Sequence, residues 1–325
     1  MHILVTGASG RIGLVLTRRL IELGHDVRGL VLPEDPRLPD VAAAGAEVLR
    51  GDLDRSTCDA AVQGVDVVYH IAGRLPQLAS PDEIFETNVR GTWNVMNAAG
   101  ARAADLLLVV FASTNDVYSS GAPLYLPTDE AHPRHPISHY GLSKVIGEEI
   151  ALDQHRRYGL PVVIARFGMT QRAREVLDGH ASHFFLLSAY VRANPERADL
   201  AATLAASGEH AIVLRDESGT PWFFQITEAH DLVEGLVLLL DHPAAIGETM
   251  NLAAPATFAT DVAAAHLARR TGLPLLDVIV PGRPLRLDDA IGKARGLIGY
   301  DPQLTITDII DRALEEVPVP DGRRA

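Results

Sequence analysis

Cysteine, basic residues and long apolar runs are all scarce in this sequence. Cys58 is the only cysteine among 325 residues, which excludes an internal disulfide and a cysteine-rich metal site. Lysines and arginines number 29 against 42 aspartates and glutamates, so the formal net charge is -13. Because this charge repels phosphates, we expect neither nucleic acid nor an anionic membrane as a partner.

Long uninterrupted apolar segments are missing as well. The most apolar stretch, LVEGLVLLL, is broken by Glu234 and is too short to span a bilayer. The first ten residues, MHILVTGASG, have neither the basic segment nor the long apolar run of a signal peptide. Together with the lone cysteine, these absences predict a cytoplasmic protein that does not enter a membrane. None of the 13 histidines forms an H-x-x-x-H pair beside a carboxylate cluster, so we expect no metal.

Short β-branched segments alternate with helical patterns through the first half of the chain. The strand candidates are HILVT, DVRGLVL, AEVLRG, VDVVYHIA, LLLVVFA and PVVIARF, and the helix candidates are 12–23, 83–102 and 140–158. Strands that are apolar on both faces and separated by helices form parallel sheets with both faces covered. The sequence therefore predicts an α/β fold with a doubly wound, Rossmann-type parallel sheet.

The alternation fails after Phe167, where the chain becomes Ala-rich and helical with isolated strands such as AIVLR and PLLDVIV. This change predicts a second, smaller domain, because 325 residues exceed what one core usually serves. We assign residues 1–168 and about 220–242 to a dinucleotide-binding domain. Residues 169–219 and 243–325 are then the substrate-binding domain.

A glycine-rich turn follows the first strand candidate. In VTGASGRIG, Gly7, Gly10 and Gly13 have the spacing G-x-x-G-x-x-G. Glycine permits a tight turn and lets backbone N–H groups approach a pyrophosphate at the positive end of a helix. At the first strand of a βαβ unit this motif predicts dinucleotide binding. The alternative is that the glycines serve only a close contact between strand and helix.

The end of the second strand gives no clear selection between NAD and NADP. In NAD-specific sites a carboxylate roughly 20 residues beyond the glycines holds the ribose hydroxyls, but Val31 and Leu32 stand there. Nearby acids could serve those hydroxyls and nearby arginines could reach a 2′-phosphate; they are Glu34, Asp35, Arg11, Arg28 and Arg37. We expect NAD(P), with NADP slightly favoured because a missing carboxylate removes repulsion of the phosphate.

Asp52 lies in RGDLDR, directly after the third strand candidate. A carboxylate there can accept a hydrogen bond from the adenine amino group, which makes Asp52 a candidate cofactor contact. The alternative is that Asp52 caps the next turn.

Tyr140 and Lys144 in ISHYGLSKVIGEE are four residues apart in a helical pattern, so they share one face of a helix. The pKa of free tyrosine is about 10, and a neighbouring ammonium lowers it by favouring the phenolate. The pair can then act as a general acid or base. Taken alone, a Tyr and a Lys at this spacing are more often a solvated surface pair.

The order of these motifs is more specific than any one of them. The chain contains TGASGRIG, GDLD, HIAG, NVRGTWNVMNAA, FASTNDVYSS, YGLSK, ARFG, EAHDLVEGL and KARGLIGYDP in that order. In this it resembles the extended short-chain dehydrogenase/reductase family, the NAD-dependent epimerase/dehydratase group, over nearly its whole length. The resemblance implies an NAD(P)-dependent oxidoreductase or epimerase that moves hydride to or from a hydroxyl or carbonyl carbon of a small molecule, and a homodimer formed through helices 83–102 and 140–158.

The resemblance also implies roles for individual residues. Tyr140 matches the catalytic acid/base, Lys144 its partner, and Thr114 the hydroxyl that binds the reacting oxygen, with Ser113 as a substitute. Asn88 matches a position lining the cleft, and Gly168 follows Phe167 near the nicotinamide. The predicted cofactor site comprises Gly7, Gly10, Arg11, Ile12, Gly13, Asp52, Leu53, Ala72, Gly73, Asn88, Lys144 and Phe167.

Two departures bear on the substrate. Sugar-nucleotide dehydratases of this family have Thr-Asp-Glu where this chain has Thr114, Asn115 and Asp116, and an amide cannot donate a proton as a carboxylic acid does. Asp116 is still a candidate auxiliary base. The turn after the sixth strand, RFGMTQRAR, lacks the pattern of nucleotide-sugar epimerases, although arginines that could bind a diphosphate are present: Arg172, Arg174 and Arg215.

A competing hypothesis is a protein that senses the dinucleotide without turnover. Such a protein has no need for the Tyr-Lys-hydroxyl set, which favours the enzyme. The sequence leaves open the substrate, among sugars, sugar nucleotides and other alcohols or ketones.

Overall fold

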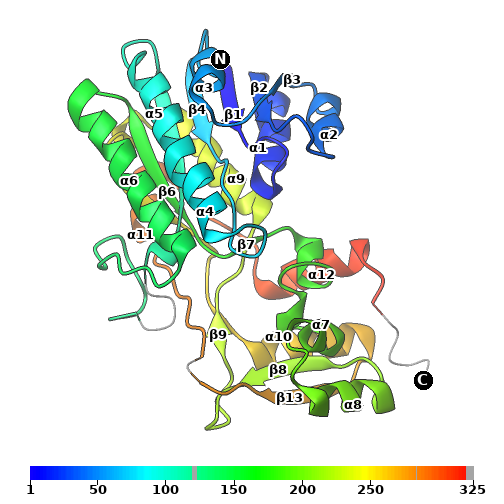
Figure 1. Ribbon diagram of the computed structural model, residues 1–325. Coiled ribbons are helices and arrows are strands. Elements are labelled where there is room, and N and C mark those ends of the chain that lie inside the picture. The colour runs from blue at the N-terminus through cyan, green and yellow to red at the C-terminus, as the bar shows by residue number, and fades with distance from the viewer. Residues whose placement is uncertain (119–122, 283, 320–325) are drawn as a thin grey trace.

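A computed structural model describes residues 1–118, 123–282 and 284–319. Its centre is a seven-stranded sheet formed by β1 (His2–Thr6), β2 (Asp26–Val31), β3 (Glu47–Arg50), β4 (Val67–His70), β5 (Leu108–Thr114), β6 (Val162–Phe167) and β11 (Thr249–Leu252). The spatial order is β11-β6-β5-β4-β1-β2-β3 and every pair is parallel. This confirms the predicted doubly wound fold (Figure 1).

Helices cover both faces of this sheet. One face packs against α1 (Arg11–Glu22), α2 (Leu38–Ala43), α9 (Ala229–Leu238) and α11 (Gly292–Ile298). The other packs against α3 (Arg55–Ala61), α5 (Thr92–Gly100) and α6 (His139–Tyr158). The central strand β5 is buried along its whole length, as expected for a strand whose two faces both meet helices.

The predicted helix 83–102 is a composite. It consists of α4 (Pro81–Ile84), a π-helical stretch η1 (Phe85–Gly91) and α5, which follow one another without a break. A capping box opens it, in which the Ser80 hydroxyl accepts from the Glu83 N–H and the Glu83 carboxylate accepts from the Ser80 N–H. In Figure 1 this composite helix lies beside α6.

A second group of elements lies below the sheet in Figure 1. Its helices are α7 (Leu187–Ala193), α8 (Ala198–Ser207), α10 (Thr260–Thr271) and α12 (Ile306–Glu316). Its strands pair as β7 (Thr170–Gln171) with β10 (Thr227–Glu228), β8 (Ala211–Arg215) with β13 (Leu275–Ile279), and β9 (Phe223–Phe224) with β12 (Phe258–Ala259). Short turns of helix connect them or the sheet: η2 (Asn115–Val117), η3 (Ala173–Val176), η4 (Ser182–Phe184), η5 (Leu239–Asp241) and η6 (Pro243–Ala245).

The division of the chain differs from the prediction after residue 243. Within the segment 220–242, α9 does return to the sheet and packs against α1, whereas β9 pairs with β12 in the lower group. However, β11 is the edge strand beside β6, and the buried residues of α11 belong to the core under the sheet. A four-residue strand and a seven-residue helix are too short to be assigned to a layer by pattern alone. That the two groups are separate domains remains a prediction.

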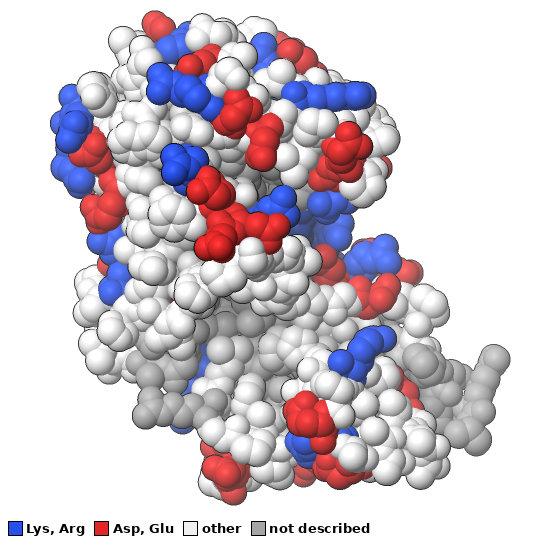
Figure 2. Space-filling model, viewed as in Figure 1, with Lys and Arg blue, Asp and Glu red and all other residues white. Residues whose placement is uncertain are grey.

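Charges of both signs intermingle on the face that Figure 2 shows, and the surface is hollowed between the sheet and the lower group. Within the residues that the structure covers, no helix is both long and apolar enough to cross a membrane. In the same residues, no cluster of three or more His, Cys, Asp or Glu side chains forms a metal site.

Candidate active site

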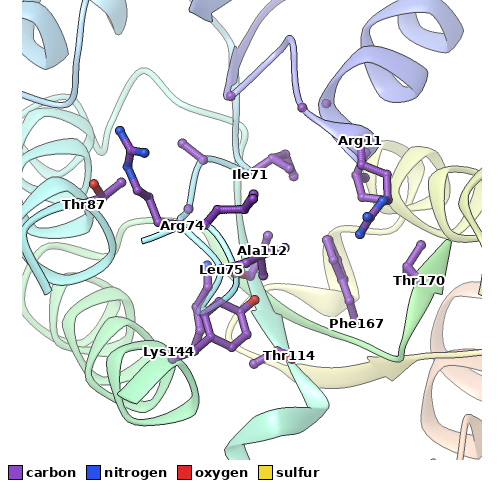
Figure 3. Close-up of a pocket in the computed structure, with 18 of the residues that line it drawn as sticks. Arg11, Ile71, Arg74, Leu75, Thr87, Ala112, Thr114, Lys144, Phe167 and Thr170 are labelled. Atoms are coloured by element: carbon purple, nitrogen blue, oxygen red, sulfur yellow. Dashed lines mark hydrogen bonds between the residues drawn. The ribbon is translucent and has the colours of Figure 1, made fainter. Parts of the chain in front are cut away.

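A cavity of about 600 Å³ lies at the carboxyl ends of the central strands. The sheet order reverses there, because the chain moves outward from β1 to β2 on one side and to β4 on the other, and such a switch point is where α/β sheets bind ligands. Apart from Asn88, all of the predicted site residues line this cavity. Figure 3 shows several of them converging from separate segments.

The glycine turn is shaped for a close approach of backbone to ligand. Gly7 has a φ of +67°, and a Cβ at this position would lie 2.8 Å from the Ala72 Cα. A Cβ on Gly13 would lie 2.1 Å from the carbonyl oxygen of Gly7. At Gly10, the N-cap of α1, no side chain caps the helix, so the first N–H groups of α1 are free for an anion. This cradle fits the pyrophosphate of a dinucleotide.

Asp35 supplies a carboxylate where the end of β2 has none. Its Oδ2 accepts from the Ser9 hydroxyl at 2.6 Å and its Oδ1 from the Arg37 N–H at 2.8 Å. Burial by itself raises the pKa of Asp35, but the hydrogen bonds from Ser9 and Arg37 lower it below its ordinary value. Ser9, Asp35 and Arg37 all line the cavity, so an ionised acid fixed to the glycine turn faces the ligand space.

Asp52 is not the cap of the following helix. That position belongs to Asp54, whose carboxylate accepts from the Thr57 N–H at 3.1 Å. Asp52 lines the cavity instead, with its Oδ1 accepting from the Leu53 N–H at 2.7 Å.

The start of α6 is fixed so that Tyr140 faces the cavity. The Ser138 hydroxyl accepts from the Gly141 N–H at 2.8 Å and donates to the Asp116 carboxylate. Gly141 allows the helix to meet the strand end, since a Cβ there would lie 2.3 Å from the Asp116 carbonyl oxygen. Tyr140 and Thr114 therefore lie together at the carboxyl end of β5.

Lys144 lies one turn further along α6 and is almost fully buried. Its Nζ donates to the Ala112 carbonyl oxygen at 2.9 Å and is 5.9 Å from the centre of the Tyr140 ring. Burial lowers the pKa of Lys144 to about 8, against the opposing effect of Glu148. The ammonium still lines the cavity.

The electrostatics of Tyr140 differ from the prediction. We expected Lys144 to lower the pKa of the phenol, but burial raises it well above the ordinary value and Asp116 adds to this, while a hydrogen bond with Thr114 opposes the rise. The physical reason is that a site shielded from water disfavours the phenolate, and the lysine is engaged with a carbonyl. In this state Tyr140 is a proton donor.

A buried network of ionic hydrogen bonds connects the elements that carry the site residues. Glu148 accepts from the Ser113 hydroxyl at 2.6 Å and from Arg166 at 2.8 and 2.7 Å. Arg166 also donates to the Tyr118 hydroxyl at 2.7 Å. The Ser113 hydroxyl is therefore committed to Glu148. The Thr114 hydroxyl, which accepts from the Asp116 N–H at 3.1 Å, lies beside the Tyr140 phenol.

Asn88 is placed differently from the prediction. It is 1% exposed and lies behind the cavity wall, where its Oδ1 accepts from the Arg74 N–H and its Nδ2 donates to the Arg74 carbonyl oxygen. Its Nδ2 also donates to the Ser143 hydroxyl at 3.0 Å. Asn88 thus holds the wall segment against α6. Ala72, Gly73, Phe167 and Gly168 line the cavity; their contact with a cofactor stays a prediction.

The arginines proposed for a diphosphate are engaged elsewhere. Arg172 pairs with Glu175 at 3.0 Å, Arg174 with Asp178 at 3.3 Å, and Arg215 with Asp277 at 2.8 Å. Within the described part of the chain, none of these arginines lines the cavity. Asn115 and Asp116 do line it, and the Asn115 amide donates to the buried Asp289 at 2.8 Å.

Several residues that line the cavity were not predicted from the sequence. Most come from irregular segments after β4 and β6 and near residue 285, where no periodicity or motif marks them; they include Arg74, Leu75, Thr87, Gln171, His180, Leu285 and Leu287. Ser9 lies inside the glycine motif, and its position beside the glycines was the one available signal.

A parallel Rossmann-type sheet with a glycine cradle and a Tyr-Lys-Thr group at one cavity defines an NAD(P)-dependent enzyme of the short-chain dehydrogenase/reductase type. The chain belongs to the NAD dependent epimerase/dehydratase family, whose model matches residues 3–253.

Known proteins of this type resemble the chain over different lengths. The crystal structure of a short-chain dehydrogenase/reductase superfamily protein from Agrobacterium tumefaciens with bound NAD has 32% identity and a TM-score of 0.88, covering 100% of this chain and 97% of that one. A 4-hydroxy-2-methyl-3-oxo-4-farnesyl-3,4-dihydroquinoline-1-oxide ketoreductase from Stigmatella aurantiaca is 29% identical over 99% of this chain and 98% of its own. A uronate dehydrogenase from Pseudomonas putida is 34% identical over 51% of this chain, and the match spans only 60% of that enzyme.

Proposed function

We propose that this protein is a dehydrogenase or reductase that interconverts an alcohol and a ketone with an exchangeable nicotinamide cofactor. The observation that carries the proposal is the convergence of Tyr140, Lys144 and Thr114 on the cavity that holds the glycine cradle. The ketoreductase that matches nearly the whole chain supports it. An epimerase built on the same group would retain its cofactor through the reaction.

Each of the three residues has a separate task in this proposal. The bound nicotinamide supplies or accepts the hydride. Tyr140 donates a proton to the oxygen of the carbonyl during reduction and takes it back during oxidation. Thr114 hydrogen-bonds the same oxygen and orients it. Lys144 places a positive charge near the Tyr140 ring, and its remaining N–H groups can donate to the ribose hydroxyls of the cofactor.

Nicotinamide absorbance tests the proposal and separates it from the sensor hypothesis. A reductase oxidises the reduced cofactor in proportion to added ketone and reduces the oxidised cofactor with the matching alcohol. A protein that binds the cofactor but changes its absorbance with no alcohol, ketone or sugar nucleotide is the sensor.

We further propose NAD as the preferred cofactor. The slight preference for NADP rested on a missing carboxylate after β2 and remains untested, but Asp35 supplies such a carboxylate on the cavity wall. Its charge would repel a 2′-phosphate and accept hydrogen bonds from ribose hydroxyls. Asp35→Asn should therefore lower the kcat/KM for NAD relative to the kcat/KM for NADP. A wild-type protein that prefers NADP, or a variant with an unchanged ratio, argues against this assignment.

A homodimer and a cytoplasmic location are part of the same proposal. Three large apolar side chains are exposed on the neighbouring helices that we predict to pair: Phe85 is 49%, Trp93 48% and Leu142 49% exposed. Burying them against a second copy would remove this apolar surface from water. The single cysteine, Cys58, is free and buried, which suits a reducing compartment.

A further inference from the structure

Much of the cavity lining is apolar. Three segments that are distant in the sequence contribute Leu75, Pro76, Leu78, Met169, Leu285 and Leu287, interspersed with the uncharged polar residues Gln77, Thr170 and Gln171. Leu78 is 75% exposed. A bound ligand could shield this apolar side chain from water. Leu75 lines the same cavity as Lys144 and Thr114, and Figure 3 shows all three around it.

Three of the positively charged side chains that line the cavity already interact with other protein groups. Among the described lining residues, Arg11 pairs with Glu175 at 2.7 Å, Arg37 lies 3.6 Å from Asp35, and Lys144 is bonded to the Ala112 carbonyl oxygen. Arg37 lies beside Asp35, at the end of the cavity where we place the cofactor. The Arg11 side chain extends toward Phe167 and Thr170 in Figure 3, and Glu175 neutralises its charge there.

Arg74 is the remaining cation among the described lining residues and directly precedes Leu75 in the sequence. Its backbone is held by Asn88, and in Figure 3 its side chain extends toward Thr87 and away from Lys144 and Thr114. One cation in that direction is a poor match for a diphosphate, which proteins usually hold with several donors or paired arginines.

The charge that lies close to the reacting centre is negative. Asp116 lines the cavity and accepts a hydrogen bond from the hydroxyl of Ser138, two residues before Tyr140. Burial raises the pKa of this carboxyl, and the hydrogen bond from Ser138 opposes the rise. A phosphate or carboxylate group of a substrate would meet repulsion there. Apolar walls, engaged arginines and a nearby acid all select against an anionic ligand.

We propose that the substrate is an uncharged, largely apolar ketone or alcohol that carries no phosphate. This inference rests on the proposed function and narrows its substrate class. With the reduced cofactor bound, a hydride would be supplied to the carbonyl carbon while Tyr140 gives its proton to the carbonyl oxygen; the alcohol forms, the cofactor is left oxidised, and Tyr140 regains a proton from solvent. The substrate binds through its apolar body and is oriented by its single oxygen.

A matched set of probes tests the inference. With reduced cofactor, 2-decalone and cyclohexanone represent apolar ketones; with oxidised cofactor, UDP-glucose and glucuronate represent charged sugars. We expect turnover of the ketones, with a higher kcat/KM for the larger one, and a kcat/KM at least about tenfold lower for both sugars. Preference for either sugar overturns the inference but leaves the proposed function standing. Cofactor that reacts with no probe refutes both, and cofactor affinity shows that the site is intact.

A variant pair locates the effect in the cavity wall. Leu75→Asn keeps the approximate side-chain size but introduces an amide, so kcat/KM for 2-decalone should fall by roughly 10- to 200-fold while cofactor affinity is unchanged. Leu124→Asn is the control, because Leu124 is 76% exposed and outside the cavity lining. A kcat/KM for 2-decalone in the Leu75 variant that equals the wild-type value overturns the proposal.

Discussion

Lys144 shows how burial sets the chemistry of a single side chain. The water-shielded site lowers its pKa to about 8 from the ordinary 10.5 and raises the pKa of Tyr140. In both residues, burial disfavours the charged form, which is the ammonium of Lys144 and the phenolate of Tyr140. The pair therefore stays protonated at neutral pH, which suits the direction in which a carbonyl is reduced.

This balance predicts a pH profile for reduction. The kcat/KM for a ketone should be constant below pH 8 and fall by about tenfold per pH unit above it, as the ammonium of Lys144 is lost. Tyr140 stays protonated across that region because its pKa is raised. In Lys144→Arg, which keeps its charge, the fall should move to higher pH. A wild-type profile that stays flat well above pH 8 contradicts this role.

The same residues show what the sequence could and could not predict. The positions of Tyr140, Lys144 and Thr114 at one cavity follow from motif spacing and strand ends, which are local properties. The direction of the Tyr140 pKa shift does not, because it depends on burial and on Asp116, which the strand end brings beside the phenol. Likewise, Asn88 resembled a cleft residue by motif, yet its contacts turn it into a support for Arg74.

At the scale of elements, Glu148 joins α6 to β5 and β6. The side chain is 1% exposed and accepts hydrogen bonds from Ser113 on β5 and Arg166 on β6. Although burial alone would raise the pKa of Glu148, these bonds and the charge of Arg166 lower it. The carboxylate is therefore ionised and fixes the helix that carries Tyr140 to the strand that carries Thr114.

Removing this charge should destabilise the protein. In Glu148→Gln the guanidinium of Arg166 loses its partner while buried, so the free energy of unfolding should fall by about 3 to 5 kcal/mol in urea denaturation. Glu149→Gln is the matched control, because Glu149 is exposed and its pairs with Arg134 and Arg156 are worth less than about 1 kcal/mol. Equal effects of the two substitutions would rule out the proposed bracing role.

Elements of the alternating first half were predictable, and an element outside it was not. The six strands from β1 to β6 follow one another with helices between them, α1 has a strong apolar face, and α6 is long and capped at both ends. In contrast, β11 is as short as β3 and β4, but it joins the sheet through pairing with β6, a contact of high sequence separation. Pattern alone therefore placed it in the wrong part of the molecule.

At the scale of the whole molecule, the proposed dimer would bury the exposed apolar side chains of Phe85, Trp93 and Leu142, and this can be tested. Trp93→Asp would bury a carboxylate in the interface, so the wild-type dimer should become a monomer in sedimentation equilibrium. Leu275→Asp on β13 is the control, since Leu275 is also exposed, at 53%, but lies outside this group. A monomeric wild type, or a dimer that survives the Trp93 substitution, contradicts the claim.

The substrate side of the molecule could not be predicted for a related reason. Its lining residues come from irregular segments, and their meeting depends on how the lower group packs against the sheet. Only the three-dimensional arrangement showed that Arg172, Arg174 and Arg215 turn to acidic partners instead of the cavity.

The central claim is that Tyr140 exchanges a proton with the substrate oxygen beside the nicotinamide. Its most direct test is single-turnover hydride transfer, followed by nicotinamide absorbance, in Tyr140→Phe, with Tyr158→Phe at the exposed end of the same helix as the control. We predict that the Tyr140 variant binds the cofactor as the wild type does and transfers hydride roughly 10² to 10⁴ times more slowly. Hydride transfer at the wild-type rate would contradict the account.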